Sequence, residues 1–345
     1  MSLFTFSKSS RILVSVFAKT DVGKTRDHNE DTFLVADLTN RRASLQPDVR
    51  EHEVGNKGSL FMVADGMGGA AAGEVASEMA TAAIYEHLTN TWIVESETTP
   101  RQFAYRLREA VERANTKIHA YAREHPDLKG MGTTTTAVGL LGDTIYLTQV
   151  GDSRAYLVRD GDAIQLTKDQ SLMQRLVDAG ELTEEEAERS ERRNIILQAL
   201  GPDAKVRVDL THQPVRRGDV LVLCSDGLSG QVRKDEIAQV VSRNDRDLVD
   251  MCGELIDLAN ERGGPDNITV LVARFSGDGL RDSTTGERVG HKVFPMLDAD
   301  SITEPVPTYP ESTQPAPEDR PRMIVAGVAS GLLMAAAIAL AALGW

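Results

Sequence analysis

The chain has 345 residues, of which 41% are hydrophobic and 26% charged, and its formal net charge at pH 7 is −14. This length can hold one large domain or two small ones. The negative charge argues against nucleic-acid binding, which needs a basic surface. The two cysteines, Cys224 and Cys252, offer no disulfide framework and fit a reducing compartment.

The first segment has Lys8, Arg11 and Lys19 among its apolar residues, so we expect no secretory signal. From residue 11 to residue 275, short stretches rich in β-branched residues alternate with helical patterns. Gly-Asp turns such as LLGDT and VRDGD join several of these stretches, which favours antiparallel hairpins. The predicted strands are ILVSVFAK, DTFLVAD, SLFMVAD, TTTTAVGLL, TIYLTQV, RAYLVRD, DVLVLCSD and NITVLVARF.

Helical patterns separate these strands. They cover about residues 73–88, 100–123 and 247–260, and the second carries an apolar stripe formed by Phe103, Leu107, Val111 and Ile118. A charge-dense helical insert occupies residues 171–200. We therefore expect one α+β domain over residues 11–275, in which strand hairpins form a sandwich with flanking helices.

Residues 276–322 show no sustained period and predict a disordered linker. Seven of the chain's thirteen prolines lie between Pro295 and Pro321. Such a composition cannot bury enough apolar surface to fold and favours an extended tether.

Residues 323–345, MIVAGVASGLLMAAAIALAALGW, contain no charged side chain. A helix of that length is ~34 Å long and can cross a bilayer core of ~30 Å. The alternative is a buried alanine-rich helix of the domain. Arg320 and Arg322 precede the stretch, so we expect a single-pass C-terminal anchor in the cell (inner) membrane, with the domain in the cytoplasm.

Acidic residues follow or precede several predicted strands. A carboxylate there costs stability unless water, a cation or a metal meets it. Each one alone has the simpler interpretation of a common Asp-Gly or Pro-Asp turn. Their repeated placement at strand ends predicts a shared site. The residues that would form it are Glu30 and Asp31 in TRDHNED, Asp65 in ADGMGG, Asp152 in VGDSRAYL, Asp226 in SDGLSG and Asp266 in GGPDN.

The ligand types in these motifs indicate the metal. Oxygen ligands without cysteine or histidine suit Mg²⁺ or Mn²⁺ rather than zinc. Glycine after Asp65 and after Asp226 leaves room for a backbone carbonyl at the same ion. Two such ions would lower the pKa of a shared water and orient it for in-line attack.

Six motifs follow one another along the chain in the order TDVGKTRDHNEDTF, VADGMGGAAAGEVAS, GMGTTTTAV, VGDSRAYL, LCSDGLSG and GGPDNITV. Over roughly residues 15–275 the chain resembles the PPM-type (protein phosphatase type 2C) metal-dependent Ser/Thr phosphatases, most of all the bacterial members. The resemblance implies a central antiparallel β-sandwich flanked by helices, in α-β-β-α layers, with a two-metal cleft at one edge. It also implies hydrolysis of phosphoserine and phosphothreonine in proteins, with a Ser/Thr kinase as opponent.

The resemblance also implies which residues hold metal. Asp65 would bridge two Mn²⁺ or Mg²⁺ ions, and the Gly66 carbonyl would bind one of them. Asp226 and Asp266 would hold one ion directly, and Asp152 would serve a weaker third ion. The nucleophile would be metal-activated water, without a phosphoenzyme.

Further roles follow from the same resemblance. Glu30 and Asp31 would support the metal cluster, partly through water. Arg26 would clamp the substrate phosphate with its bidentate fork. The insert at about residues 171–194 would be a mobile flap that influences substrate choice.

The chain departs from the family pattern at the general acid. Met67, Ala70 and Gln170 stand where relatives often have histidine. No general acid can therefore be assigned from sequence, and a metal-bound water is one candidate. His28 lies between acidic and amide groups, and either a structural or a proton-shuttling role is open for it.

Other chemistries fit less well. DVGKTR lacks the first glycine of a phosphate-binding P-loop, because that position is Ala18. Cys224 is not followed by the arginine that a cysteine phosphatase needs, since Gly230 stands there, and we expect it to be a buried strand residue. GDSRA lacks the second glycine of a serine-hydrolase elbow. Two alternatives to a protein phosphatase stay open: a catalytically weak sensor or scaffold of the same fold, and a hydrolase of small phosphates.

Overall fold

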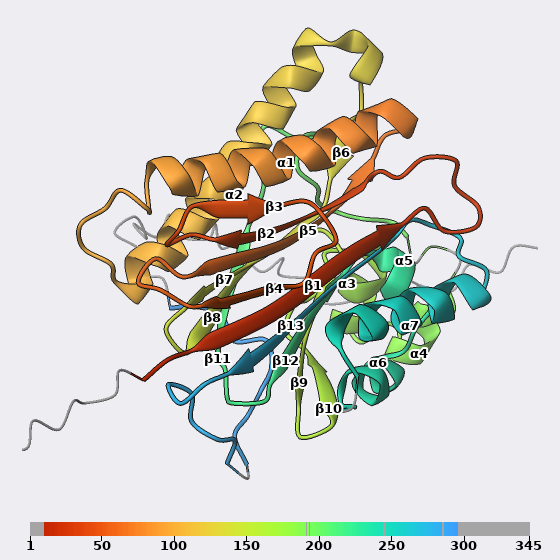
Figure 1. Ribbon diagram of the computed structural model, residues 1–345. Coiled ribbons are helices and arrows are strands. Elements are labelled where there is room, and N and C mark those ends of the chain that lie inside the picture. Colours follow the sequence, from red (N-terminus) through yellow and green to blue (C-terminus); the bar gives the residue numbers. More distant parts are fainter. Residues whose placement is uncertain (1–9, 191, 193, 244–245, 285, 296–345) are drawn as a thin grey trace, which may run out of the picture. The chain divides into compact units, whose positions relative to one another are not determined.

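The computed structural model describes residues 10–295, apart from residues 191, 193, 244–245 and 285. Two antiparallel sheets stack face to face (Figure 1). One has six strands in the order β10-β9-β12-β13-β1-β4, and the other has seven, in the order β11-β8-β7-β5-β2-β3 with β6 paired to β5. The strands are β1 (Leu13–Asp21), β2 (Asp31–Asp37), β3 (Arg42–Ser44), β4 (Arg50–Glu53), β5 (Ser59–Met67), β6 (Gly132–Thr133), β7 (Thr135–Leu141), β8 (Thr144–Val150), β9 (Arg154–Arg159), β10 (Asp162–Gln165), β11 (Asp209–Pro214), β12 (Val220–Cys224) and β13 (Ile268–Ser276).

Side-chain alternation explains why the sheets stack. In β12, Leu221 and Leu223 belong to the core between the sheets, whereas Val222 and Cys224 belong to the core under the helices. Successive side chains of a strand point to opposite faces, so a strand that is covered on both sides is apolar throughout. The prediction of a buried Cys224 in a strand is confirmed.

Helices cover the outer face of each sheet (Figure 1). On the seven-stranded sheet, α1 (Ala70–Asn90) contacts β2 and β5, and α2 (Pro100–Glu124) contacts β7 and β8. On the six-stranded sheet, α7 (Leu248–Glu261) contacts β1 and β13, and α6 (Lys234–Val241) contacts β10. The predicted α+β fold with antiparallel sheets between helices is confirmed.

Helix α2 shows how sequence determines one of these layers. Thr99 and Gln102 form a capping box around Pro100 at the first helical turn. The predicted stripe of Phe103, Leu107, Val111 and Ile118 is completely buried. Apolar residues that recur with a 3.6-residue period lie on one face of the helix, and α2 packs that face against the sheet.

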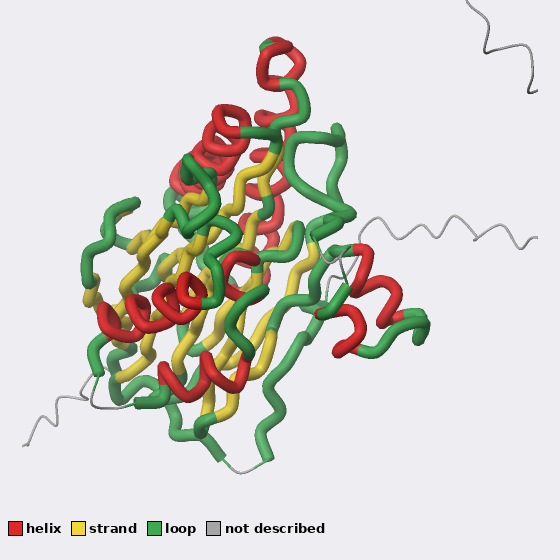
Figure 2. The backbone as a smooth tube through the Cα atoms, turned by 90° about the vertical axis from the view of Figure 1, so that its right-hand side faces the viewer, coloured by secondary structure: helices red, strands yellow, loops and turns green. Residues whose placement is uncertain are grey.

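The insert after β10 contains two short helices, α3 (Leu172–Asp178) and α4 (Glu184–Glu188), which lie beside the sheets (Figure 2). Its two ends meet at the base. The Leu172 amide donates to the Ile195 carbonyl, and the Leu197 amide donates to the Gln170 carbonyl. A short helix, α5 (Asp226–Ser229), follows β12, and a 3-10 turn spans Pro126–Leu128.

The chain stays packed against the sheets beyond β13, whereas the sequence predicts that the linker begins at residue 276. We call residues 277–295 the strap. Leu280 is buried, and the Phe294 ring packs edge-on against Tyr146 and His212. The amide of Phe294 donates to the Leu210 carbonyl, so the strap adds to the β11 edge.

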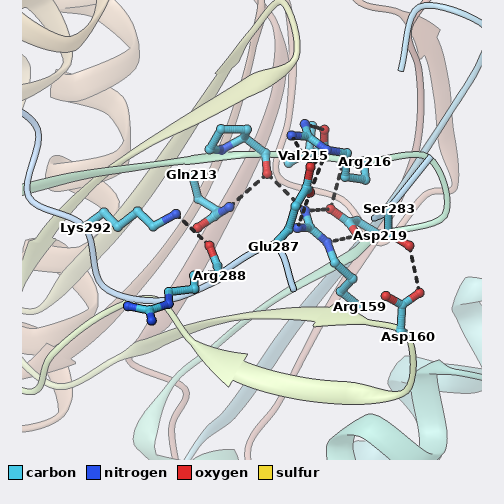
Figure 3. Close-up of polar contacts among 11 residues, drawn as sticks. Arg159, Asp160, Gln213, Val215, Arg216, Asp219, Ser283, Glu287, Arg288 and Lys292 are labelled. Atoms are coloured by element: carbon cyan, nitrogen blue, oxygen red, sulfur yellow. Dashed lines mark hydrogen bonds and ion pairs between the residues drawn. The ribbon is translucent and has the colours of Figure 1, made fainter. Parts of the chain in front are cut away.

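An ion-pair network also fastens the strap (Figure 3). Glu287 lies between Arg216 and Arg159, with oxygen–nitrogen distances of 2.8 and 3.2 Å. Arg159 in turn pairs with buried Asp219 at 2.6 Å. These contacts join the strap to β9 and to the turn before β12, so the folded unit extends to Pro295.

In the described part of the chain, no helix is both long enough and apolar enough to cross a membrane. The predicted membrane helix at residues 323–345 lies outside that part, and so do residues 296–322 of the predicted linker.

Candidate active site

The predicted acidic residues lie at one end of the sandwich because of the strand pairing. Asp31 begins β2 and Asp65 lies near the end of β5, and the two residues are directly opposite each other in the antiparallel pair. Asp226 follows β12, and Asp266 precedes its neighbour β13. Asp152 lies in the turn between β8 and β9. Both sheets therefore contribute to one acidic cluster.

Asp31 connects the two sheets directly. Its Oδ2 accepts a hydrogen bond from Ser225 Oγ and another from Thr269 Oγ1, both at 2.7 Å. Ser225 follows β12 and Thr269 lies in β13, so both donors come from the sheet opposite β2. The Asp31 side chain is fixed by these two hydroxyls, which suits the predicted supporting position.

Asp65 is fixed mainly through its backbone. Its amide donates to Thr134 Oγ1 at 3.1 Å, and its carbonyl accepts from the Thr134 amide and from Thr133 Oγ1. These threonines come from TTTT, where the sequence indicates only a strand. Because these bonds hold the Asp65 backbone on both sides, the direction in which its carboxylate enters the cluster is restrained.

Gly66 allows close approach of three segments. A Cβ at this position would collide with the carbonyl oxygens of Gly73 and Glu30. The Gly66 amide donates to that Glu30 carbonyl at 3.2 Å. Glycine is therefore needed here for the packing of α1 and of the Glu30 segment, in addition to any carbonyl–metal contact.

Asn267 organises the loop that carries Arg26 and His28. Its Nδ2 donates to the Val22 and His28 carbonyls, and its Oδ1 accepts from the Glu30 amide at 2.8 Å. The sequence analysis missed this residue, although its place directly after Asp266 was a usable signal. The loop lines a cavity of about 220 Å³ whose walls include Arg26, His28 and Glu30.

Arg26 is half exposed at the cavity. Its guanidinium donates to Asp266 Oδ2 at 2.9 Å. Desolvation acts to lower the pKa of Arg26, but the Asp266 and Glu30 carboxylates together outweigh it, and the pKa is raised above its usual value. The arrangement keeps a permanently positive fork beside the acidic cluster, where it can meet an anion.

The carboxylates of the cluster are crowded and short of positive partners. Burial raises the pKa of Asp31 to about 7 and that of Asp226 to about 6. Burial also raises the pKa of Asp152 to about 8 and that of Asp65 well above its usual value. Neighbouring carboxylates add to each shift, because like charges disfavour a second ionised group. A bound cation would reverse this effect.

Unpaired oxygens test whether these residues fit a metal. Glu30 Oε1, Asp152 Oδ1 and Asp226 Oδ1 are buried and accept no hydrogen bond from the described residues. Among the described residues, no three His, Cys, Asp or Glu side chains are close enough to enclose an ion by themselves. Carbonyl and water ligands complete many Mg²⁺ and Mn²⁺ sites, and buried unpaired carboxylate oxygens are costly without a cation. The donor set therefore fits a hard cation.

Three residues, Met67, Ala70 and Gln170, stand where relatives often have histidine, and His28 lies nearby. Met67 lies at the end of β5, opposite Gly132. Gln170 is buried, and its side chain bonds to the Gly151 amide and to Asp209. His28 is exposed beside the cavity. Ala70 begins α1. Neither Met67 nor Gln170 can protonate a leaving group.

Comparison with known proteins identifies the family. The model of the family "Protein phosphatase 2C" matches residues 41–271. The chain belongs to the protein phosphatase 2C family. It is 38% identical over 254 residues to the serine/threonine phosphatase stp of Listeria welshimeri, which covers 74% of this chain and 93% of the relative.

Solved structures of bacterial members of the protein phosphatase 2C family agree with the fold. The Mycobacterium tuberculosis phosphatase PstP/Ppp has a TM-score of 0.63 and 37% identity, covering 76% of this chain and 98% of its own. The PstP catalytic domain in complex with two manganese ions has a TM-score of 0.62 and 37% identity, covering 77% and 99%. The sandwich is thus the one that carries two manganese ions in PstP.

Proposed function

We propose that this chain is a metal-dependent protein-serine/threonine phosphatase, which hydrolyses phosphoserine and phosphothreonine in proteins. The observation that carries the proposal is the acidic cluster, whose buried carboxylate oxygens lack partners at the end of a phosphatase-family sandwich. The manganese-bound PstP domain and the phosphatase of Listeria support it. A scaffold without metal would leave these oxygens uncompensated, so the structure gives the sensor alternative no support.

In this proposal two Mn²⁺ or Mg²⁺ ions would bind the cluster, held by the carboxylates of Asp65, Asp226 and Asp266 and by the Gly66 carbonyl. Asp152 would hold a weaker third ion. When bound, the ions supply an activated water for attack on phosphorus and offset the charge of the carboxylates.

The remaining residues of the site act on the substrate and on the ligands. Arg26 binds the phosphate through its fork, for which the half-exposed guanidinium is already beside the cavity. Glu30 and Asp31 support the ligands, and the hydrogen bonds of Ser225 and Thr269 keep Asp31 oriented. These hydrogen bonds hold the cluster in one geometry. Two-ion chemistry requires such a fixed arrangement of ligands.

We also propose that residues 323–345 anchor the chain in the cell membrane, through the linker over residues 296–322. The uncharged 23-residue stretch supports the anchor, and Arg320 and Arg322 support a cytoplasmic catalytic domain. A Ser/Thr kinase at the same membrane face would supply the phosphoproteins that this enzyme consumes.

The substrate class is tested by comparing initial rates of phosphate release by the full-length chain with Mn²⁺. The substrates are a phosphothreonine peptide, a phosphotyrosine peptide of the same sequence, and ATP. We expect the phosphothreonine peptide to be hydrolysed fastest. Faster hydrolysis of ATP would instead favour the alternative of a small-phosphate hydrolase.

A further inference from the structure

One histidine lies among the described residues that line the cavity beside Arg26. The cavity has a volume of about 220 Å³, and its walls are Thr25, Arg26, Asp27, His28, Glu30 and Gly69. Both Arg26 and His28 are exposed to solvent there, two residues apart on the same loop. A guanidinium and an imidazole therefore border the space in which the proposed substrate phosphate would lie.

The loop that carries His28 is held by contacts that do not involve the imidazole. Asn267 Nδ2 donates to the His28 carbonyl at 2.9 Å. Asn29 Nδ2 donates to Thr20 Oγ1 at 2.8 Å, and Asn29 Oδ1 accepts from the Asp31 amide at 3.1 Å. Because these bonds use the backbone of His28 and the side chains of its neighbours, we expect the loop to keep its place when the imidazole is removed.

The proposed reaction needs a proton at the leaving oxygen. Hydrolysis breaks the bond between phosphorus and the Oγ of threonine or serine, and Oγ keeps the electron pair of that bond. An alkoxide is a poor leaving group in water. A side chain that supplies a proton as the bond breaks typically accelerates such a step by about 10²–10⁴-fold.

The other walls of the cavity are poorly suited to this step. The guanidinium of Arg26 does not give up a proton at neutral pH. Ionised carboxylates accept hydrogen bonds and donate none. The Glu30 carboxyl group is also buried against Gly73 of α1, where a Cβ would collide with it. Imidazole is the side chain that gains and loses a proton between pH 5 and 8, so His28 fits the task best.

We propose that His28 is a catalytic residue, which donates a proton to the leaving Oγ while Arg26 binds the phosphate. The inference rests on the proposed function, because it assigns a part in that reaction. As water adds to phosphorus, the phosphorus–Oγ bond breaks, its electron pair moves to Oγ, and the imidazolium N–H proton follows. The products are inorganic phosphate and an uncharged hydroxyl side chain. The proton that the attacking water releases restores the imidazolium through solvent.

The first test compares two leaving groups in the full-length chain with Mn²⁺. A phosphothreonine peptide needs a proton at its leaving oxygen, whereas p-nitrophenyl phosphate releases a stable anion that needs none. For His28→Ala we expect kcat on the peptide to fall by about a hundredfold with KM unchanged. We expect kcat on p-nitrophenyl phosphate to change by less than about threefold. His291→Ala is the matched control, because His291 is exposed in the strap, and both rates should stay normal.

Added imidazole tests the role of the ring itself. In His28→Ala the exposed side of the cavity can admit a small molecule where the ring was. We expect imidazole to restore hydrolysis of the phosphothreonine peptide by about tenfold, in proportion to its concentration, and to leave the wild-type chain unaffected. Failure of imidazole to raise the rate of His28→Ala would contradict proton donation at this position.

Mn²⁺ binding and stability distinguish proton donation from a structural role. Calorimetric titration with Mn²⁺ and urea denaturation should give the same results for His28→Ala and for the wild-type chain. Weaker Mn²⁺ binding, or an equal loss of activity on both substrates, would overturn the proposal, because His28 would then shape the site. If His28→Ala does not fold, His28→Gln keeps a polar side chain of similar size and should show the same difference between the two substrates.

The wild-type rates separate this inference from the proposed function. Absence of hydrolysis of both substrates by the wild-type chain would refute the proposed function, and the role of His28 with it. Normal hydrolysis of the phosphothreonine peptide by His28→Ala would refute the role of His28 alone and would leave the phosphatase assignment intact.

Discussion

Asp31 illustrates how single residues determine the geometry of the site. Its carboxylate is buried and belongs to one sheet, while its two hydroxyl donors, Ser225 and Thr269, belong to the other. A buried carboxylate that loses a donor must stay charged with fewer hydrogen bonds or take up a proton. The side chains that orient the acidic cluster therefore matter as much as its proposed metal ligands.

Thr269→Val should destabilise the fold because it keeps the β-branched shape but removes the hydroxyl that contacts both Asp31 Oδ2 and Thr20 Oγ1. We expect a loss of about 1–3 kcal/mol in the free energy of unfolding, measured by urea denaturation. Thr116→Val is the control, since Thr116 is exposed in α2 and donates only to the Glu112 carbonyl of its own helix. Equal small losses in the two variants would show that Asp31 does not depend on Thr269.

At the scale of elements, the predictable parts are those with strong periods or ordered motifs. Strands β5 and β12, which lead into Asp65 and Asp226, and the apolar stripe of α2 could be predicted from sequence, because each is a long apolar pattern. Strand β11 reads DLTHQP and was missed, because an edge strand needs few apolar residues. Helix α6 was missed because eight residues give only two turns of period.

The strap was missed for a different reason. It docks through separate residues, among them Leu280, Glu287 and Phe294, which show no period in the sequence. Only the folded sheets bring their partners together. At the site, the positions of the carboxylates could be predicted from motifs, whereas the supporting contacts of Asn267 and Gln170 depend on tertiary structure.

The ion pairs beneath the strap should contribute strongly to stability. Arg159→Met leaves Asp219 buried without its guanidinium partner, and we expect a loss of about 3–5 kcal/mol in the free energy of unfolding. The control is Arg113→Met on the exposed face of α2, for which we expect about 0.5 kcal/mol or less. Urea denaturation of both proteins measures the difference, and similar values would mean that the network is not structurally important.

At the scale of the whole molecule, the site and the strap lie at different parts of the same sandwich. The acidic cluster forms only when the two sheets stack, because Asp65 comes from one sheet and Asp226 from the other. Binding of ions to the folded state alone would therefore stabilise the whole domain. The strap completes that domain at the β11 edge, before the chain continues into the predicted linker.

The central claim is that metal held by the acidic cluster drives hydrolysis of phosphothreonine. The most direct measurement is phosphate release from a phosphothreonine peptide by the full-length chain, with Mn²⁺, with a chelator, and with Asp226→Asn. Asp257→Asn, on the exposed face of α7, is the matched control. We expect Mn²⁺-dependent release that the chelator abolishes and that Asp226→Asn lowers by more than about a hundredfold, with normal release in the control. Release that persists in Asp226→Asn, or no release with Mn²⁺ from a folded chain, would contradict the account.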